Sequence, residues 1–305
     1  MSDGRRKSAS RRRVDLFREL QGKLGFLYLA ASVALVLLVA GAVYFFIFYQ
    51  GILPFTRYRL SLGEFLSTTW SPLGSPPQYG ALAFLYGSAV VTLGAALLAT
   101  PLSLGAAIFV AEIAPRWGGR VLTPVLEILV GIPSVVYGYI GMRLLVPFVR
   151  DHFGGIGFSL FAGILVLTVM ILPTVTSVAV DALRAVPMEM KHGSYALGAT
   201  RWQTISRLSI RAALPGLLTA VIFGMARAFG EALAVQMVIG NAPRFPESLL
   251  DPGATITSII TMSMGFAAEG TLEYYVLWTL AVILLLMSAL SIFVVRLLGR
   301  RGVYA

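Results

Sequence analysis

The chain has 305 residues, of which 57% are hydrophobic and 12% charged, against roughly 25% charged in soluble domains. This composition excludes an ordinary soluble protein, and the absence of cysteine excludes disulfide bonds and cysteine-ligated metals. The net charge of +10 is compatible with nucleic-acid binding, but it can equally come from membrane topology, and the positions of Lys and Arg decide between the two.

Apolar runs of about 20 residues, the length that a helix needs to cross a bilayer, recur along the whole sequence. A transmembrane helix pairs its backbone polar groups within one segment, whereas the strands of a membrane barrel would alternate apolar and polar residues. We therefore predict an all-α membrane protein with six transmembrane helices. They are expected at residues 24–48, 82–113, 122–149, 158–183, 212–239 and 272–298, and the third is expected to break or bend at residues 131–134, GIPS.

The polar and basic residues 1–23 predict a cytoplasmic N-terminal tail close to anionic lipid headgroups. Within the first apolar run, Ala40-Gly41-Ala42 is similar to a signal-peptidase site. The run is too long for a cleaved signal and continues past that site, so a retained helix is predicted. The expected organisation is a tail at 1–23 and a six-helix membrane domain at 24–300.

The distribution of Lys and Arg predicts the orientation of the helices. Residues 1–23, 114–121, 184–211 and 296–305 together hold 18 of the 24 Lys and Arg residues. Because cytoplasmic connections carry an excess of these residues, both termini and the long loop at 184–211 are predicted to be cytoplasmic. This arrangement accounts for the net charge without a nucleic-acid partner.

The cytoplasmic loop at about 187–211 shows helical spacing of apolar residues. Tyr195, Leu197 and Trp202, with Ile205 and Leu208 further on, are candidates for one broad apolar face. The break at 198–200 is expected to separate two short helices, with Thr200 as the N-cap of the second. Such a helix either docks a peripheral partner or lies on lipid, and the residues alone leave both alternatives open.

Two charged residues, Arg227 and Glu231, interrupt the apolar sequence of the predicted fifth helix. Their i, i+4 spacing places both side chains on one face of a helix. A charge near the bilayer centre costs about 2.5–3.5 kcal/mol, so both are expected to face the bundle interior. They form either an anion site, in which Glu231 holds Arg227 while the site is empty, or a buried ion pair that fixes helix packing.

Other polar residues give weaker signals. Glu112, Glu127 and Asp181 fall near the predicted cytoplasmic boundary, where solvation or pairing with Arg120 or Arg184 is expected to account for them. The sequence contains two histidines and neither an H-E-x-x-H nor a G-x-x-x-x-G-K-[ST] motif. We expect neither a metal site nor ATP hydrolysis in this chain, and no nucleophile–base constellation indicates an intramembrane enzyme.

The cytoplasmic loop resembles that of ABC-importer permeases, which carry E-A-A, three residues, Gly, and then about nine residues to I-x-L-P. Here the Gly falls on Gly198, and the E-A-A positions fall on residues 192–194, which read HGS. The I-x-L-P positions fall on residues 208–211, which read LSIR, so that the Glu and the Pro of the pattern are absent. The resemblance implies a coupling helix that docks on the ATP-hydrolysing subunit through Tyr195, Leu197, Gly198, Ala199, Thr200 and Trp202.

A narrower resemblance covers roughly residues 60–300. Residues 224–235 read GMARAFGEALAV and are followed by Gly240-Asn241, which resembles the G-x-x-R-A-x-G-E-x-x-A-V…G-N signature of phosphate-uptake permeases of the Pst system. Residues 131–138, GIPSVVYG, and 101–105, PLSLG, resemble two further signatures. The residues after Glu231 look more like the C-type permease than its A-type partner.

The resemblance implies a type I, MetI-like permease bundle in the bacterial inner membrane. It implies a substrate pathway at Arg227 and Glu231, to which the hydroxyls of Ser134 and Tyr137 are candidates to add hydrogen bonds. Implied partners are an A-type permease, a dimer of ATP-binding subunits that holds ATP and Mg, an extracytoplasmic phosphate-binding protein, inorganic phosphate and lipid. Alternatives are a sulfate or molybdate permease, or a secondary anion transporter with Glu231 as proton carrier.

Overall fold

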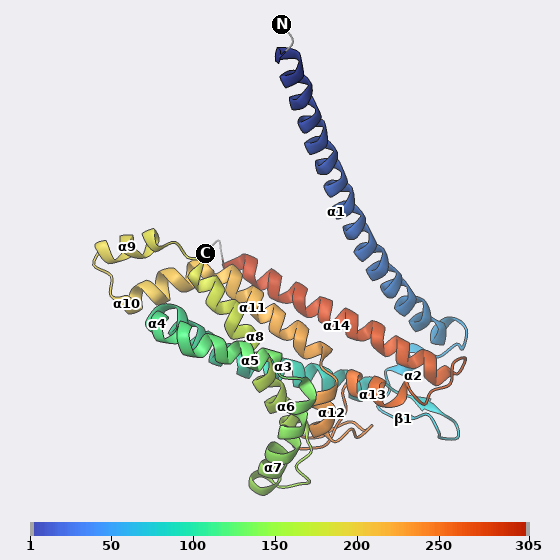
Figure 1. The fold of residues 1–305 in the computed structure, drawn as a ribbon. Helices are drawn as coiled ribbons and strands as arrows, with labels where there is room; N and C mark the ends of the chain where they lie inside the picture. The colour runs from blue at the N-terminus through green and yellow to red at the C-terminus, as the bar shows by residue number, and fades with distance from the viewer. Residues whose placement is uncertain (1–2, 303–305) are drawn as a thin grey trace. The chain divides into compact units, whose positions relative to one another are not determined.

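The computed structural model describes the backbone of residues 3–302 and the side chains of residues 25–297. Regular structure in this part of the chain is almost entirely helical (Figure 1). The chain divides into two units, Met1–Gln50 and Gly51–Ala305. Helix α1 spans Asp3–Thr56, so its residues up to Gln50 belong to the first unit and its residues from Gly51 on belong to the second. The first helix is therefore longer than predicted, and the side chains of the predicted tail at 1–23 lie outside the described ones.

Short elements follow α1 in the second unit. Helix α2, Leu62–Phe65, precedes an antiparallel hairpin of β1, Trp70–Ser71, and β2, Gln78–Tyr79. The indole of Trp70 makes edge contacts with the rings of Tyr79 and Phe84, at 5.8 and 5.2 Å between centroids. These aromatic residues belong to a core that also contains buried side chains of the last helix, so the hairpin is packed against the helices.

Two long helices form the centre of the second unit, as the apolar runs predicted. Helix α3, Leu82–Ile108, continues through the π-helical turn η1, Phe109–Ile113, and helix α8 spans Leu160–Arg184. Small residues bring them together: a Cβ added at Gly94 would lie 2.8 Å from Cδ1 of Ile164. The largest core cluster is built from buried residues of these two helices and of the elements that cross them.

The third span contains the break that the sequence predicts at residues 131–134. It consists of two halves, residues Pro115–Gly131 and Ser134–Phe153, bent by 94° at Ile132 and Pro133. The bend arises because Ile132 has an extended backbone with ψ of 127°, which is the conformation that a following proline favours. The elements in order are α4, Pro115–Trp117; η2, Gly118–Leu122; α5, Thr123–Gly131; α6, Ser134–Ile140; η3, Gly141–Leu145; and α7, Val146–Phe153.

The C-terminal half begins with a helix pair beyond α8. Helix α9 spans Met188–Ala196, and α10, Arg201–Gln203, continues through the π-helical turn η4, Thr204–Ser209, into α11, Ile210–Gly230. Helices α12, Leu233–Ile239; α13, Ile256–Ser263; and α14, Leu272–Gly302, complete the chain. In Figure 1, α9 and α10 lie at one end of α3, α8, α11 and α14, and α13 lies towards the other end.

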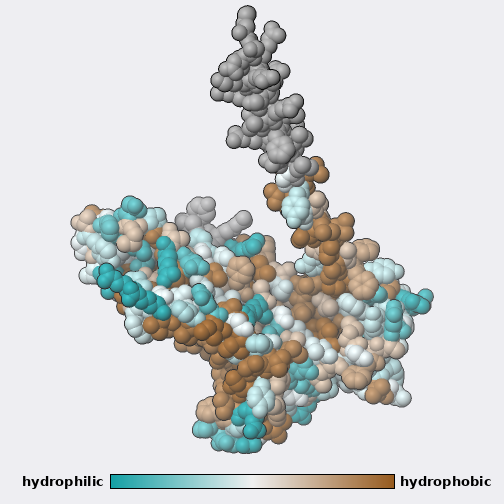
Figure 2. Space-filling view, viewed as in Figure 1, coloured by the Kyte–Doolittle hydropathy of each residue, from teal (hydrophilic) through white to brown (hydrophobic). Residues whose placement is uncertain are grey.

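The surface fits a membrane environment. Among the described residues, five helices are long and apolar enough to cross a bilayer, and the bent pair makes a sixth if it counts as one span. Figure 2 shows hydrophobic residues along the helices, with hydrophilic residues gathered over α9 and α10 and around α7. Large apolar side chains such as Leu97 and Ile128 stay 75% and 68% exposed, as expected where lipid or another chain replaces water.

Candidate functional site

Arg227 lies in the last turn of α11, among residues of the apolar bundle. Its side chain is partly buried, and Nη1 donates a hydrogen bond to Oγ1 of Thr174 on α8, at 2.9 Å. A guanidinium keeps its charge at any physiological pH. Within residues 25–297, no carboxylate lies within 4 Å of it, and the partner that the structure provides is a neutral hydroxyl. The positive charge of Arg227 is therefore held in place without being neutralised.

Glu231 occupies a break between two helices. Helix α11 ends at Gly230, and the backbone of Glu231 is extended, with φ of −77° and ψ of 122°. Its Oε1 accepts a hydrogen bond from the amide of Ala234 at 2.9 Å, near the start of α12. A carboxylate in this position satisfies an amide that has no partner within the helix and interacts favourably with the helix dipole. Glu231, one residue before the N-cap Ala232, thus satisfies an amide at the start of α12.

The prediction of one continuous helix over 212–239 is consequently wrong, and so is the placement of Arg227 and Glu231 on one helical face. Gly230 weakens the helix because it carries no side chain to restrict the backbone. The carboxylate of Glu231 then offers the next helix a cap, and the two helices become separate. The ion pairs formed by the described side chains are Arg150–Asp151 and Lys191–Glu112, and the pair Arg227–Glu231 is not among them.

Two threonines at this site were missed by the sequence reasoning. Thr174 binds Arg227 from 53 residues away, and Thr257 on α13 donates from Oγ1 to the backbone oxygen of Glu231 at 2.9 Å, from 26 residues away. Threonine hydroxyls in apolar helices more commonly bond to their own helix backbone, as that of Thr168 does here. No local signal distinguishes Thr174 or Thr257 from such a residue.

Ser134 and Tyr137 lie just after the bend between α5 and α6. Ser134 is the first residue of α6 and is partly buried, while Tyr137 is buried. The hydroxyl of Tyr137 donates to the backbone oxygen of Leu129 at 2.8 Å, near the end of α5. This hydrogen bond joins the two sides of the bend. A contact of either residue with substrate stays a prediction.

The two broken helices pack against each other just beyond their breaks. Gly138 of α6 lies so close to α12 that an added Cβ would be 2.9 Å from Cα of Ala234 and 2.8 Å from Sδ of Met237. Both α6 and α12 contribute to the largest core cluster. Tyr137 belongs to this packed region, and Arg227 and Glu231 lie at the break that precedes α12.

The loop at 187–211 forms the helix pair that its sequence predicted. Gly198 has a φ of 81°, a left-handed conformation that ends α9 and suits glycine. Thr200 caps α10: its Oγ1 accepts from the amide of Gln203 at 3.3 Å, and the Gln203 side chain accepts from the amide of Thr200 at 2.8 Å. The prediction that Thr200 is the N-cap is confirmed.

Three of the predicted docking side chains project into solvent. Tyr195, Leu197 and Trp202 are 43%, 90% and 64% exposed, whereas Ile205 is buried in the bundle. The expected single face is therefore divided between an outer set and an inner set. An open groove of about 440 Å³ lies beside them, lined by Ser194, Leu197, Gly198, Ala199, Gln203, Arg207 and Leu208.

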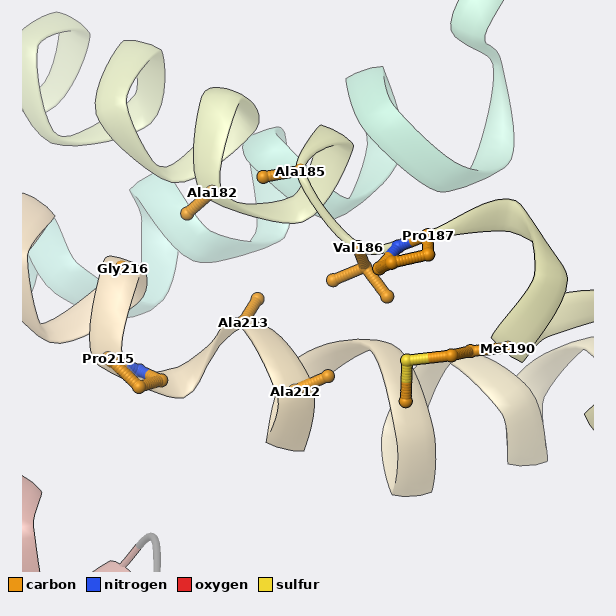
Figure 3. A pocket seen from close by; sticks show the side chains of 9 residues that line it. All are labelled: Ala182, Ala185, Val186, Pro187, Met190, Ala212, Ala213, Pro215 and Gly216. Carbon is orange, nitrogen blue, oxygen red and sulfur yellow. The ribbon is translucent and has the colours of Figure 1, made fainter.

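A second hollow, of about 330 Å³, lies at the base of α9 (Figure 3). It separates the end of α8 from the start of α11, and Met190 of α9 lines it beside Val186 and Pro187. The other lining residues are Ala182, Ala185, Ala212, Ala213, Pro215 and Gly216. All of these residues are apolar, so the hollow offers no charged group to an anion.

Glu112 lies at the end of η1, as expected, but its partner differs from the expected Arg120 or Arg184. Its Oε1 accepts from Nζ of Lys191 on α9 at 2.8 Å. Lys191 is itself buried, although it comes from a loop that reads as a solvated basic segment. The periodicity of the loop gave no indication that Lys191 faces inward. The side chain points inward because its partner Glu112 lies at the end of η1, 79 residues earlier in the chain.

Comparisons with known proteins agree with this architecture. Residues 103–302 match the family described as binding-protein-dependent transport system inner membrane component. The inward-facing methionine ABC transporter MetNI contains a chain of similar fold, with a TM-score of 0.57 and 19% sequence identity, covering 72% of this chain and 95% of that one.

Three relatives illustrate the sequence similarity. The probable ABC transporter permease protein YqgH of Bacillus subtilis is 49% identical over 286 residues, which cover 93% of each chain. A phosphate transport system permease protein PstC from Xylella fastidiosa is 38% identical and covers 67% of this chain and 69% of its own. The PstC protein of Haemophilus influenzae is 34% identical and covers 77% and 80%.

Proposed function

The chain belongs to the family of binding-protein-dependent transport system inner membrane components, and from this premise we propose that it is the permease subunit of an ATP-driven phosphate importer. It is a multi-pass membrane protein. Relatives that cover two thirds or more of the chain are named phosphate transport system permease proteins. The observation that carries the anion assignment is Arg227, a partly buried guanidinium whose charge no described carboxylate neutralises.

The chemistry of Arg227 suits a passing phosphate. A guanidinium is weakly hydrated and presents paired N–H donors that match two oxygens of a phosphate. One donor is held by Thr174. An arriving anion accepts hydrogen bonds from the remaining N–H donors. Its hydrogen bonds to the charged guanidinium are stronger than the one that the neutral hydroxyl of Thr174 forms. The single hydroxyl holds Arg227 in position without competing strongly for it, which allows brief binding and release.

Glu231 contributes by shaping the site. Its carboxylate is bound to the start of α12, so a negative charge sits beside the pathway but is directed at the amide of Ala234. This arrangement keeps the break between α11 and α12 open and leaves Arg227 available. A substrate that passes the break meets one positive side chain and the hydroxyls of Thr174 and Thr257. These groups are too few for strong selection among anions, which this proposal assigns to the binding protein.

Transport in this proposal follows alternating access. A homologous A-type permease completes the pathway, and an extracytoplasmic phosphate-binding protein delivers the anion to the end of the bundle opposite α9. ATP and Mg are bound by a dimer of separate ATP-hydrolysing subunits. These subunits dock on the outer side of α9 and α10, where Tyr195, Leu197 and Trp202 are exposed. Closure of the ATPase dimer displaces α9, and the bundle switches sides.

The test is uptake by vesicles that contain the chain, its partner permease, the ATPase and the binding protein. Labelled phosphate, sulfate and molybdate are compared with ATP inside, for the wild type and for Arg227→Gln. We expect ATP-dependent phosphate uptake in the wild type and a loss of about tenfold or more in Arg227→Gln, because a charged hydrogen bond to the anion is removed. Assembly is followed by co-purification of the four components.

Arg150→Gln is the matched control, because Arg150 forms an exposed ion pair with Asp151 away from the site. It should transport like the wild type. Undiminished uptake in Arg227→Gln would assign Arg227 a structural role. Uptake of sulfate or molybdate in place of phosphate would keep the permease assignment and contradict the proposed substrate.

A further inference from the structure

The inner face of α9 is fastened to the rest of the chain. Nζ of Lys191 lies 2.8 Å from Oε1 of Glu112, and the two side chains keep only 9% and 8% of their surface exposed. Three residues further along, Oγ of Ser194 is hydrogen bonded to the buried Thr204 Oγ1 at 2.9 Å. The i, i+3 spacing places Lys191 and Ser194 on one side of α9. Tyr195 is exposed to solvent instead.

A third contact strengthens the same junction. Nη2 of Arg201 donates to the backbone oxygens of Glu112 and Ile113 at 2.5 and 2.7 Å. These oxygens belong to the end of η1, where helical carbonyls lack partners and a cation is favourable. Arg201 is the first residue of α10, so both short helices of the loop are attached to the end of the helix formed by α3 and η1.

A buried ion pair is a poor way to gain stability, because both ions lose their hydration and an apolar replacement is often equally stable. Its geometric requirement is strict, however, and one partner alone is strongly unfavourable. An ion pair in which both side chains are buried therefore fixes the two helices that carry them relative to each other. Here it fixes α9 against a helix to which it has no direct chain connection, since 79 residues separate Glu112 from Lys191.

We infer that Glu112, Lys191 and Arg201 form a latch that makes α9, α10 and the end of α3–η1 move as one body. The inference rests on the proposed function, in which the ATPase displaces α9. Without the latch, that displacement reaches the bundle only through the covalent connections of the loop to α8 and α11. With it, the displacement is also delivered to α3. Glu112 and Lys191 are then positioning residues for coupling.

Contacts further along α3 lead from the latch to the site. The buried Ser103 on α3 donates from Oγ to the backbone oxygen of Leu172 on α8 at 3.1 Å. Leu172 precedes Thr174 by two residues, and Thr174 holds Arg227. Because α3 and α8 pack along their length, a movement of α3 is carried to the part of α8 that binds Arg227. The latch therefore connects ATPase docking with the anion site.

The first measurement is the number of anions transported per ATP hydrolysed, for the wild type, Lys191→Met and the exchanged pair Glu112→Lys with Lys191→Glu. This ratio does not depend on how much transporter is assembled. In Lys191→Met we expect ATP hydrolysis to continue while the ratio falls by about tenfold, since a buried partner is lost. The exchanged pair should recover most of the ratio, because Arg201 binds backbone oxygens that the exchange leaves in place.

Arg150→Gln serves again as the control, since it removes an ion pair whose side chains are 55% and 57% exposed. Its ratio should equal that of the wild type. An unchanged ratio in Lys191→Met would overturn the latch, and so would a lowered ratio that the exchanged pair does not raise. Absence of uptake in the wild type would instead contradict the proposed function.

A second measurement does not require transport. The chain has no native cysteine, so spin labels can be attached to Met188→Cys on α9, outside the proposed docking residues, and to Leu102→Cys on α3; these side chains are 57% and 58% exposed in the unsubstituted chain. In the assembled transporter their distance distribution should be narrow and should broaden in Lys191→Met. A distribution that Lys191→Met leaves unchanged would show that α9 is held to α3 without the ion pair.

Discussion

At the scale of the residue, the partner of a charge decides what the charge can do. Arg227 is bound by a hydroxyl and Glu231 by a backbone amide, so the two charges are positioned separately. Lys191 and Glu112 are bound to each other and buried, so their charges fix the position of α9 against the end of η1. The described side chains thus use charge in two ways: one guanidinium is bound by a neutral hydroxyl, and one ion pair joins two helices.

The hydroxyl of Thr174 is predicted to position Arg227 for the anion. Thr174→Val preserves the shape of the side chain and removes the hydrogen bond at 2.9 Å, so phosphate uptake should fall by about tenfold, in line with a hydrogen bond to a charged group. Thr174→Ser should retain uptake. The measurement is initial uptake rate in vesicles, with the phosphate concentration varied.

Thr176 provides the matched control on the same helix. Its hydroxyl bonds to the backbone oxygen of Leu172 in its own helix at 2.8 Å, and it does not contact Arg227. Thr176→Val should therefore transport at a rate close to that of the wild type. Equal losses in Thr174→Val and Thr176→Val would show that the polarity of α8 matters in general and that Thr174 has no particular role.

At the scale of the element, breaks in the helices place the site. The bend of 94° between α5 and α6 and the break between α11 and α12 bring two short helices into contact. Inside a bilayer, non-helical backbone is tolerated only where protein buries it or where it lines a cavity. Hydrogen bonds from Tyr137 and Thr257 to backbone oxygens near the two breaks meet part of this requirement.

Gly138 is predicted to be essential for the contact between α6 and α12. In Gly138→Ala the new Cβ would lie 2.9 Å from Cα of Ala234, a backbone atom that cannot move aside without shifting α12. Overpacking of this kind destabilises by about 1–3 kcal/mol. The midpoint of thermal unfolding in detergent should fall accordingly, and uptake should decrease because α12 adjoins Glu231.

Gly131 is the appropriate comparison, because an added Cβ there has nothing within 4 Å. Gly131→Ala should leave the unfolding midpoint unchanged or raise it slightly, since alanine stabilises a helix by about 0.5–1 kcal/mol relative to glycine. A Gly138→Ala protein as stable as Gly131→Ala would mean that α6 and α12 are not packed as the structure has them.

At the scale of the whole molecule, the charges and exposed groups divide the second unit into two polar ends and an apolar middle. The end with α9 and α10 carries Lys191, Arg201 and Arg207, and the other end carries the β1 hairpin. The excess of Lys and Arg predicts that the first end is cytoplasmic. Two strongly exposed residues, Leu197 and Leu73, mark the two ends.

The orientation is tested by labelling single cysteines in a chain that has none of its own. Leu197→Cys should react with a membrane-impermeant maleimide only when the cytoplasmic side is accessible, and Leu73→Cys only from the opposite side, because these side chains are 90% and 96% exposed. Labelling of both from one side would contradict the predicted topology, and reversed labelling would place α9 and both termini outside the cytoplasm.

The sequence by itself determined the class of protein, most of its helices and the form of the loop at 187–211. These features depend on local quantities: the length of an apolar run, the capping side chain of Thr200 and the left-handed backbone of Gly198. A run of apolar residues matches the thickness of the bilayer, and the backbone and caps of its helix form their hydrogen bonds within one segment, so both can be read from adjacent residues.

Only the tertiary structure decided which side chains meet. Thr174 is 53 residues from Arg227 and Glu112 is 79 residues from Lys191, and no local pattern links such positions. The separation of Arg227 from Glu231 also depended on packing, because a Gly in an apolar run is compatible with a continuous helix until a cap and a neighbouring helix favour a break. Side-chain partners are chosen by helices that are distant in the sequence, and therefore the charges of the site and of the latch acquire their roles only in the folded chain.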